Sequence, residues 1–197
     1  MSALPKKRFT PAEYAAHELT ALGKHEYFDG EIFSMAGGTP EHSKIAANCT
    51  LEVGSRLRGK PCQVYTSDLM IAVEATGLRT YPDMSVICGP MQRDAEVPVA
   101  VTNPSVIFEV VSPTTEAYDR GRKSWNYTRI PSLQTLVLVS STRREIEVRE
   151  RQTDGSWLLR TYTEAGETVP LPRLGVSLTV EAVYAGVELP ELPEHAA

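Results

Sequence analysis

One carboxylate interrupts a run of apolar residues that is otherwise typical of a fully buried strand. The run covers residues 106–111, VIFEVV, and Glu109 is its only charged member. An ionised carboxylate that is buried without a partner costs several kcal/mol. Glu109 therefore needs a cation, a strong set of hydrogen-bond donors or a raised pKa. These requirements make it a candidate metal ligand.

A second acid, Asp83, opens another apolar strand over residues 83–88, directly after Tyr81-Pro82. Consecutive strands are usually neighbours in a sheet, so both carboxylates can converge on one ion. Hard oxygen ligands of this kind suit Mg²⁺ or Mn²⁺. The backbone carbonyl of Val110 could supply a third ligand. Together these residues indicate metal-assisted hydrolysis.

Each acid also has a simpler interpretation. Glu109 could pair with a buried arginine or complete a polar network in the core. Asp83 follows a proline at the start of a strand, which is common turn chemistry. The residues alone leave both alternatives open, although the two acids together favour the metal site over either acid considered alone.

Three further residues recur at intervals of four after this strand: Asp119, Lys123 and Tyr127. They share one face of the helix that is expected over residues 115–129, in which Gly121 is a weak point. A lysine near a metal-bound water can orient the nucleophile or stabilise charge on a phosphate. The pattern alone favours a solvated Asp–Lys pair, worth about a few tenths of a kcal/mol.

Two more candidates lie nearer the N-terminus. His42 falls in the first turn of a predicted helix, where a side chain can face a cleft, although a lone histidine there is more often a cap or a surface residue. Glu26 and Glu31 flank an Asp-Gly turn, and for both the simpler interpretation is an exposed strand face. Their roles remain open at this point.

The elements that position these residues follow from local signals. A capping box with proline at N1 predicts a helix from Thr10 to about Thr20. The Asp29-Gly30 turn predicts a hairpin over 25–35. Apolar residues repeating every fourth position predict a helix from Thr39 that stops near Gly59. Further strands are expected at 63–65, 69–74, 83–88, 106–112 and 136–140, a loop at 89–99, and hairpins after 140.

Composition places the chain among globular proteins. It has 197 residues, of which 42% are hydrophobic, and a formal net charge of −5. We expect one domain spanning residues 1–197, with 188–197 as a flexible tail. The charge gives no global attraction to nucleic acid, so any DNA affinity should be modest and sensitive to salt.

The cysteines and the N-terminus bear on the compartment. Cys49, Cys62 and Cys88 show no CxxC or Cys/His spacing. We therefore expect no disulfide and no zinc site among them, with Cys49 and Cys88 as small core residues. Residues 1–8 lack the apolar core of a secretion signal, and no apolar run is long enough to span a membrane. These features favour a cytoplasmic protein.

Five segments, in this order, carry a resemblance to a known family. The chain resembles the Uma-type restriction endonucleases, a bacterial branch of the PD-(D/E)XK nuclease superfamily. The matching segments are 25–31 (HEYFDGE), 35–42 (MAGGTPEH), 81–83 (YPD), 108–115 (FEVVSPTT) and 119–123 (DRGRK). Each is weak alone, but their joint order is specific. The resemblance implies an α/β (α+β) fold: a restriction-endonuclease-like core with a mixed β-sheet flanked by helices, plus additional β-hairpins.

The resemblance also implies a site. Asp83 matches the Asp of the PD element and Glu109 matches the acid of the (D/E)XK element. The usual lysine position holds Val111, and Lys123 on the following helix is the matching lysine. Glu26 and His42 match auxiliary positions of the family.

The expected function is that of a Mg²⁺- or Mn²⁺-dependent endonuclease that hydrolyses DNA. Cleavage of both strands of a duplex needs two active sites, and a homodimer is the simplest assembly that provides them. The alternative is a catalytically silent nucleic-acid-binding or protein-interaction domain on the same fold. A third class, a two-carboxylate hydrolase that uses no metal, is disfavoured because only two Trp residues are present to build a sugar-binding cleft.

Overall fold

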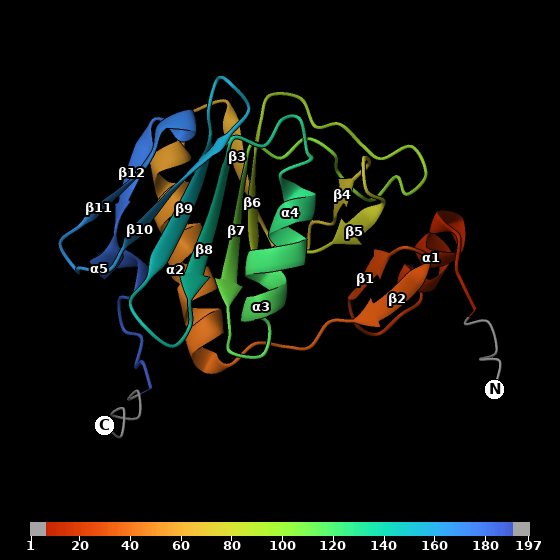
Figure 1. Ribbon diagram of the computed structural model, residues 1–197, viewed down its shortest axis with the longest axis horizontal. Coiled ribbons are helices and arrows are strands. Elements are labelled where there is room, and N and C mark those ends of the chain that lie inside the picture. Colours follow the sequence, from red (N-terminus) through yellow and green to blue (C-terminus); the bar gives the residue numbers. More distant parts are fainter. Residues whose placement is uncertain (1–6, 191–197) are drawn as a thin grey trace.

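The protein is described here by a computed structural model covering residues 7–190 (Figure 1). Its centre is a six-stranded mixed sheet in the order β10-β9-β8-β7-β6-β3. The strands are β3 (Cys62–Thr66), β6 (Met84–Cys88), β7 (Val106–Val111), β8 (Thr135–Ser140), β9 (Ile146–Arg151) and β10 (Trp157–Tyr162). The α+β architecture predicted from the sequence is confirmed.

The two middle strands of this sheet form its one parallel pair. Every residue of β7 and β8 is buried, as expected for strands covered on both faces. A parallel pair needs a crossover connection, and the helical segment between β7 and β8 supplies it. The other pairings within the sheet are antiparallel.

The long helix α2 (Pro40–Leu57) covers one face of the sheet and lies behind it in Figure 1. It begins where predicted, because the Thr39 side chain accepts a hydrogen bond from the backbone N–H of His42. Its apolar stripe is buried against strands β6 to β9 and against the C-terminal elements. Those elements are β11 (Thr168–Leu171), the 3₁₀ turn η2 (Pro172–Leu174), β12 (Val176–Thr179) and α5 (Val180–Val183).

The other face of the sheet is covered by the crossover segment. It comprises α3 (Glu116–Tyr118), a π-helical turn η1 (Asp119–Lys123) and α4 (Ser124–Tyr127). The helix predicted over residues 115–129 is therefore present, and the weak point expected at Gly121 lies in the middle of the π turn. Such turns insert an extra residue into a helix and often occur at functional sites.

A smaller four-stranded sheet, ordered β2-β1-β5-β4, lies beside the central one (Figure 1). It contains the predicted hairpin of β1 (His25–Phe28) and β2 (Glu31–Ser34), whose turn residues Asp29 and Gly30 both have positive φ. Helix α1 (Pro11–Glu18), with the predicted capping box, packs on it. The strand predicted at 69–74 is the shorter β4 (Ile71–Val73), and β5 (Leu78–Thr80) was not predicted.

The expectation of unpaired cysteines is wrong for two of the three. Cys62 and Cys88 form a disulfide between β3 and β6. The antiparallel register places these two residues directly opposite each other, a proximity that their spacing along the chain does not reveal. Cys49 is free and buried in α2, as predicted. The disulfide removes the argument from cysteine usage for a reducing compartment.

Two expectations concern the ends and the membrane. Most of the tail predicted over 188–197, namely residues 191–197, lies outside the described residues, as do residues 1–6. Within 7–190, no helix has the length and apolar character needed to cross a bilayer.

Candidate metal and catalytic site

The two predicted acids meet at one end of the β6–β7 pair. These strands are antiparallel, with Met84 opposite Phe108. One residue further along this register, Asp83 falls opposite Glu109. The strands are therefore neighbours, as the sequence predicted, and the two carboxylates flank the same end of the ladder.

Asp83 is fixed by contacts from both sides. The backbone N–H of Val110 donates a hydrogen bond of 2.7 Å to Asp83 Oδ2. His42 Nε2, in the first turn of α2, lies 3.3 Å from the same oxygen. The hydrogen bond to Asp83 raises the pKa of His42 above 6.5, although burial opposes this shift. Since the N–H and C=O of a strand residue point to the same side, the Val110 carbonyl also points toward β6, the strand that follows Asp83.

Glu109 is buried at 4% exposure. Its Oε1 lies 2.7 Å from Lys123 Nζ and accepts a 2.6 Å hydrogen bond from the Tyr127 hydroxyl. Burial raises the pKa of Glu109; Lys123 opposes this shift, whereas Asp83 and Asp119 add to it. The carboxylate is thus held by two donors and electrostatically coupled to a second acid.

Lys123 is not the solvated surface residue that the helical pattern favoured. It is 5% exposed, and its neighbour Asp119 is 6% exposed. Burial lowers the pKa of Lys123, but Glu109 and Asp119 raise it by more, so the net shift is upward. Lys123 Nζ lies 3.7 Å from Asp119 Oδ1. Asp119 and Lys123 are the first and last residues of the π turn, and both are buried over the sheet. The side chains of a solvated i,i+4 pair would instead be exposed.

Val111, at the position where the resemblance would place a lysine, is buried in the apolar cluster beneath the crossover helix. A lysine there would have to extend through packed side chains. Lys123 instead reaches the Glu109 carboxylate from the helix side.

Glu26 also lies at this site rather than on an exposed strand face. It is 6% exposed and accepts a hydrogen bond from the hydroxyl of Tyr118. Its charge is among those that raise the pKa of Lys123. The small sheet therefore contributes a third acid to the surroundings of Lys123, and the structure brings all six predicted site residues, Val110 included, toward one end of the sheet.

The donor atoms fit a hard divalent cation. In the part of the chain that the structure describes, Asp83 Oδ1 and Glu109 Oε2 accept no hydrogen bond. Each carboxylate thus keeps one oxygen for a ligand while the protein orients the other. Carboxylate and carbonyl oxygens are the ligands that Mg²⁺ and Mn²⁺ prefer.

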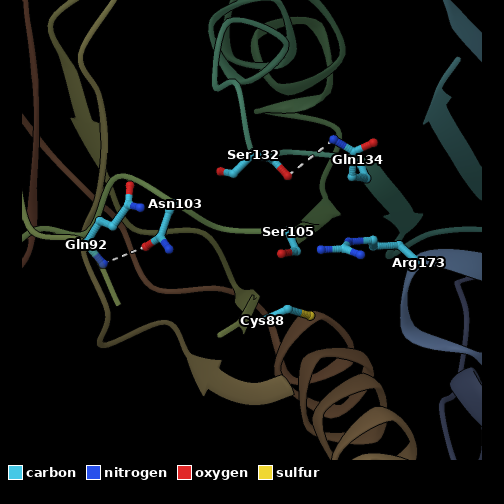
Figure 2. Close-up of a pocket in the computed structure, with 7 residues that line it drawn as sticks. All are labelled: Cys88, Gln92, Asn103, Ser105, Ser132, Gln134 and Arg173. Atoms are coloured by element: carbon cyan, nitrogen blue, oxygen red, sulfur yellow. Dashed lines mark hydrogen bonds between the residues drawn. The ribbon is translucent and has the colours of Figure 1, made fainter. Parts of the chain in front are cut away.

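A polar pocket, drawn in Figure 2, lies at the opposite end of the sheet. Its volume is about 320 Å³, and Arg173 extends toward Ser105 within it. Since β6 ends at Cys88, the length of this strand separates the pocket from Asp83. The lining residues are Cys88, Gln92, Asn103, Ser105, Ser132, Gln134 and Arg173, and they include none of the predicted site residues.

A mixed sheet that is flanked by helices, with an acid at each of two neighbouring strands and a lysine beside them, defines a restriction-endonuclease-like nuclease fold. The family model described as "Uma2: Putative restriction endonuclease" matches residues 11–181. The chain belongs to this family, which confirms the family predicted from the sequence.

Two proteins of Synechocystis and one solved structure are similar to this chain. An uncharacterized protein of Synechocystis sp., slr1290, is 40% identical over 93% of this chain and 95% of its own length. A second, sll1609, is 32% identical over 78% of this chain and 86% of its own length. A crystal structure from Anabaena variabilis, described as a "putative nuclease belonging to DUF820", has a TM-score of 0.71 at 17% identity, covering 90% of this chain and 98% of the other. That likeness shows the shared fold.

Proposed function

We propose that this protein is a Mg²⁺- or Mn²⁺-dependent endonuclease that hydrolyses phosphodiester bonds in DNA at the Asp83–Glu109 pair. The observation that carries the proposal is the position of these acids opposite each other across β6 and β7, each with one oxygen free of hydrogen bonds from the described residues. Membership of a restriction endonuclease family supports the same reaction class.

Asp83, Glu109 and the Val110 carbonyl would hold the cation. When bound, it supplies polarisation of the phosphodiester and lowers the pKa of a bound water. His42 and the Val110 N–H keep the Asp83 carboxylate in one orientation, and Tyr127 does the same for Glu109. Such partners matter because misplaced ligands lose affinity and activity.

Lys123 would act on the substrate side of Glu109. Its Nζ is 2.7 Å from Oε1, so its remaining protons can be donated to the attacking water or to a phosphate oxygen. Because Lys123 is buried and stays charged, it would stabilise negative charge in the transition state more strongly than a solvated lysine.

DNA would approach a molecule whose overall charge is negative, at −5. Local groups must therefore attract the phosphates. Arg122 is exposed next to Lys123 and lies over the Phe28 ring, 4.1 Å from the centroid. The N-terminus of α2, with its partial positive charge, also lies at the site through His42. With so few contacts, activity should fall steeply with salt.

Cleavage of plasmid DNA tests the proposal. Wild type should nick or cut with Mg²⁺ or Mn²⁺, whereas Ca²⁺ should support binding better than cleavage because it activates water less well. Asp83→Ala and Glu109→Ala should abolish cleavage. Lys123→Ala should slow it by roughly 10²-fold or more. Asp68→Asn, an acid that is exposed on the surface, is the matched control and should retain activity.

The second candidate is a catalytically silent binding domain. It is favoured by the fact that Lys123 and Tyr127 already satisfy one Glu109 oxygen as a buried polar network. In that case Asp83→Ala would leave DNA binding unchanged, and neither wild type nor variant would cut. Cleavage that persists in Asp83→Ala would not come from the acid pair, and tracing it to a contaminant would favour this candidate.

Cutting both strands of a duplex requires two active sites, so we propose a homodimer. The edge strand β10 offers an exposed apolar side chain for such an interface, since Leu159 is 51% exposed. Light scattering should give a dimer for wild type and a monomer for Leu159→Lys. A monomeric wild type that makes only single-strand nicks would contradict the dimer.

A further inference from the structure

A second group of metal-binding side chains lies on the small sheet, away from the acid pair. His17 and Glu18 end helix α1, and His25 opens strand β1 after the connecting loop. One ligand atom from each of these three residues lies within 4.8 Å of the other two. The loop between α1 and β1 thus brings two imidazoles and a carboxylate to one point.

One pair of atoms in this group has the spacing of ligands on a tetrahedral ion, and that pair is hydrogen-bonded in the metal-free protein. Ligands at about 2.0–2.1 Å from zinc are about 3.3 Å from one another when the geometry is tetrahedral. His25 Nδ1 lies 3.1 Å from Glu18 Oε2, close to that separation. The His17 and His25 rings are 4.6 Å apart between centroids and meet edge to face, and one ring nitrogen of each lies within 4.8 Å of the other.

The carboxylate of this group is already oriented. Glu18 Oε1 accepts hydrogen bonds from the Tyr81 hydroxyl at 2.9 Å and from the backbone N–H of His25 at 3.0 Å. These donors leave Oε2 facing the imidazole. Supporting hydrogen bonds of this kind fix ligand orientation in metal sites. The Glu18 and His25 side chains are only 8% and 18% exposed, whereas His17 is exposed and leaves the outer side open to water.

We propose that His17, Glu18 and His25 form a second metal site, which binds a borderline transition ion such as Zn²⁺. Two imidazoles and one carboxylate suit zinc rather than the hard cations expected at the acid pair. The fourth ligand would be water. The bound ion would crosslink the end of α1 to the start of β1.

This site is separate from the acid pair, yet it is joined to it by one strand. Successive residues of a strand point to opposite faces. His25 faces α1, whereas the next residue, Glu26, faces the crossover helix and accepts the hydrogen bond of Tyr118. An ion at His25 would therefore stabilise the strand that places Glu26 beside Lys123.

Zinc titration of the chelator-treated protein tests the proposal. With ZnCl₂ alone, calorimetry should give one more bound ion for wild type than for His17→Ala, and the melting temperature of wild type should rise with Zn²⁺. Because His17 is exposed, this variant should fold, which far-UV circular dichroism checks. Glu18→Gln should also lose the ion. In both variants we expect at least about a tenfold loss of affinity.

His42→Ala and Asp83→Ala are the matched controls, since they remove a histidine and a carboxylate at the other site. Both should keep the zinc ion that His17→Ala loses. Co²⁺ in place of Zn²⁺ should give the strong visible absorption of a tetrahedral complex in wild type and not in His17→Ala. Equal zinc affinity in wild type and His17→Ala, or loss of zinc only in the controls, would overturn the proposal.

Discussion

Replacing Lys123 by methionine is the sharpest test of the buried ion pair. The change keeps most of the side-chain volume but removes the charge that lies 2.7 Å from Glu109 Oε1. Both partners are almost fully buried, at 5% and 4% exposure, so solvent cannot replace the lost contact. Removing one partner of a buried pair typically destabilises a protein by about 3–5 kcal/mol.

The cost should depend on pH. Glu109 can avoid an unpaired charge by taking up a proton, which its raised pKa already favours. At pH 9 the Glu109 carboxylate must either stay ionised without a partner or bind a proton that is scarce in solution, so we expect the variant to lose about 3–5 kcal/mol of stability. At pH 5 protonation is easy, and the loss should be smaller. The Tyr127 hydroxyl remains as a donor in both cases.

Urea denaturation in EDTA, at pH 5 and pH 9, measures this difference. The double variant Glu109→Gln/Lys123→Met should recover much of the loss, with a coupling energy of about 2 kcal/mol. Lys44→Met, at an exposed position of α2, should change stability by no more than about 0.5 kcal/mol. If Lys123→Met changes the free energy of unfolding as little as Lys44→Met does at both pH values, the Lys123–Glu109 ion pair is not formed in solution.

Three further predictions concern stability. Burial raises the pKa of Glu109 from 4.5 to about 8, so between these pH values the folded apo protein binds more protons than the unfolded chain. Its stability should therefore fall as pH rises from about 4.5 to about 8. Glu109→Gln should flatten this slope, and an unchanged slope would exclude Glu109 as its source. Tyr127→Phe should cost about 1.5–3 kcal/mol in urea denaturation at pH 9, where Glu109 is ionised, because it removes a hydrogen bond to the carboxylate. No loss of stability at pH 9 would mean that the Tyr127 hydroxyl does not contact Glu109. The disulfide closes a loop of 26 residues, so its reduction should lower the free energy of unfolding by about 3.5 kcal/mol. Cys88→Ser should show the same loss without reductant. No change on reduction would mean that the two cysteines are not joined.

Much of the core could be predicted because its signals are local. The Thr10 capping box and the Asp29-Gly30 turn each determine an element within a few residues. The apolar runs of β6 and β7 locate two buried strands, and the usual adjacency of consecutive strands brings Asp83 toward Glu109.

The features that could not be predicted depend on tertiary register. The disulfide requires β3 to pair with β6 in one register, and no local pattern specifies it. Tyr118 and Glu26 are 92 positions apart in the chain. Burial of Lys123 depends on the π turn, and a helical-periodicity argument assumes that no such turn is present. These are contacts between elements, for which a single sequence gives little signal.

Soaking crystals of the protein in MnCl₂ and recording anomalous diffraction tests the central claim most directly. We expect a manganese peak between Asp83 and Glu109, within about 2.0–2.3 Å of an oxygen of each, and its loss in Asp83→Ala crystals. The contrary result is an intact Lys123–Glu109 pair with no peak at the two acids, at Mn²⁺ concentrations that support DNA cleavage in solution.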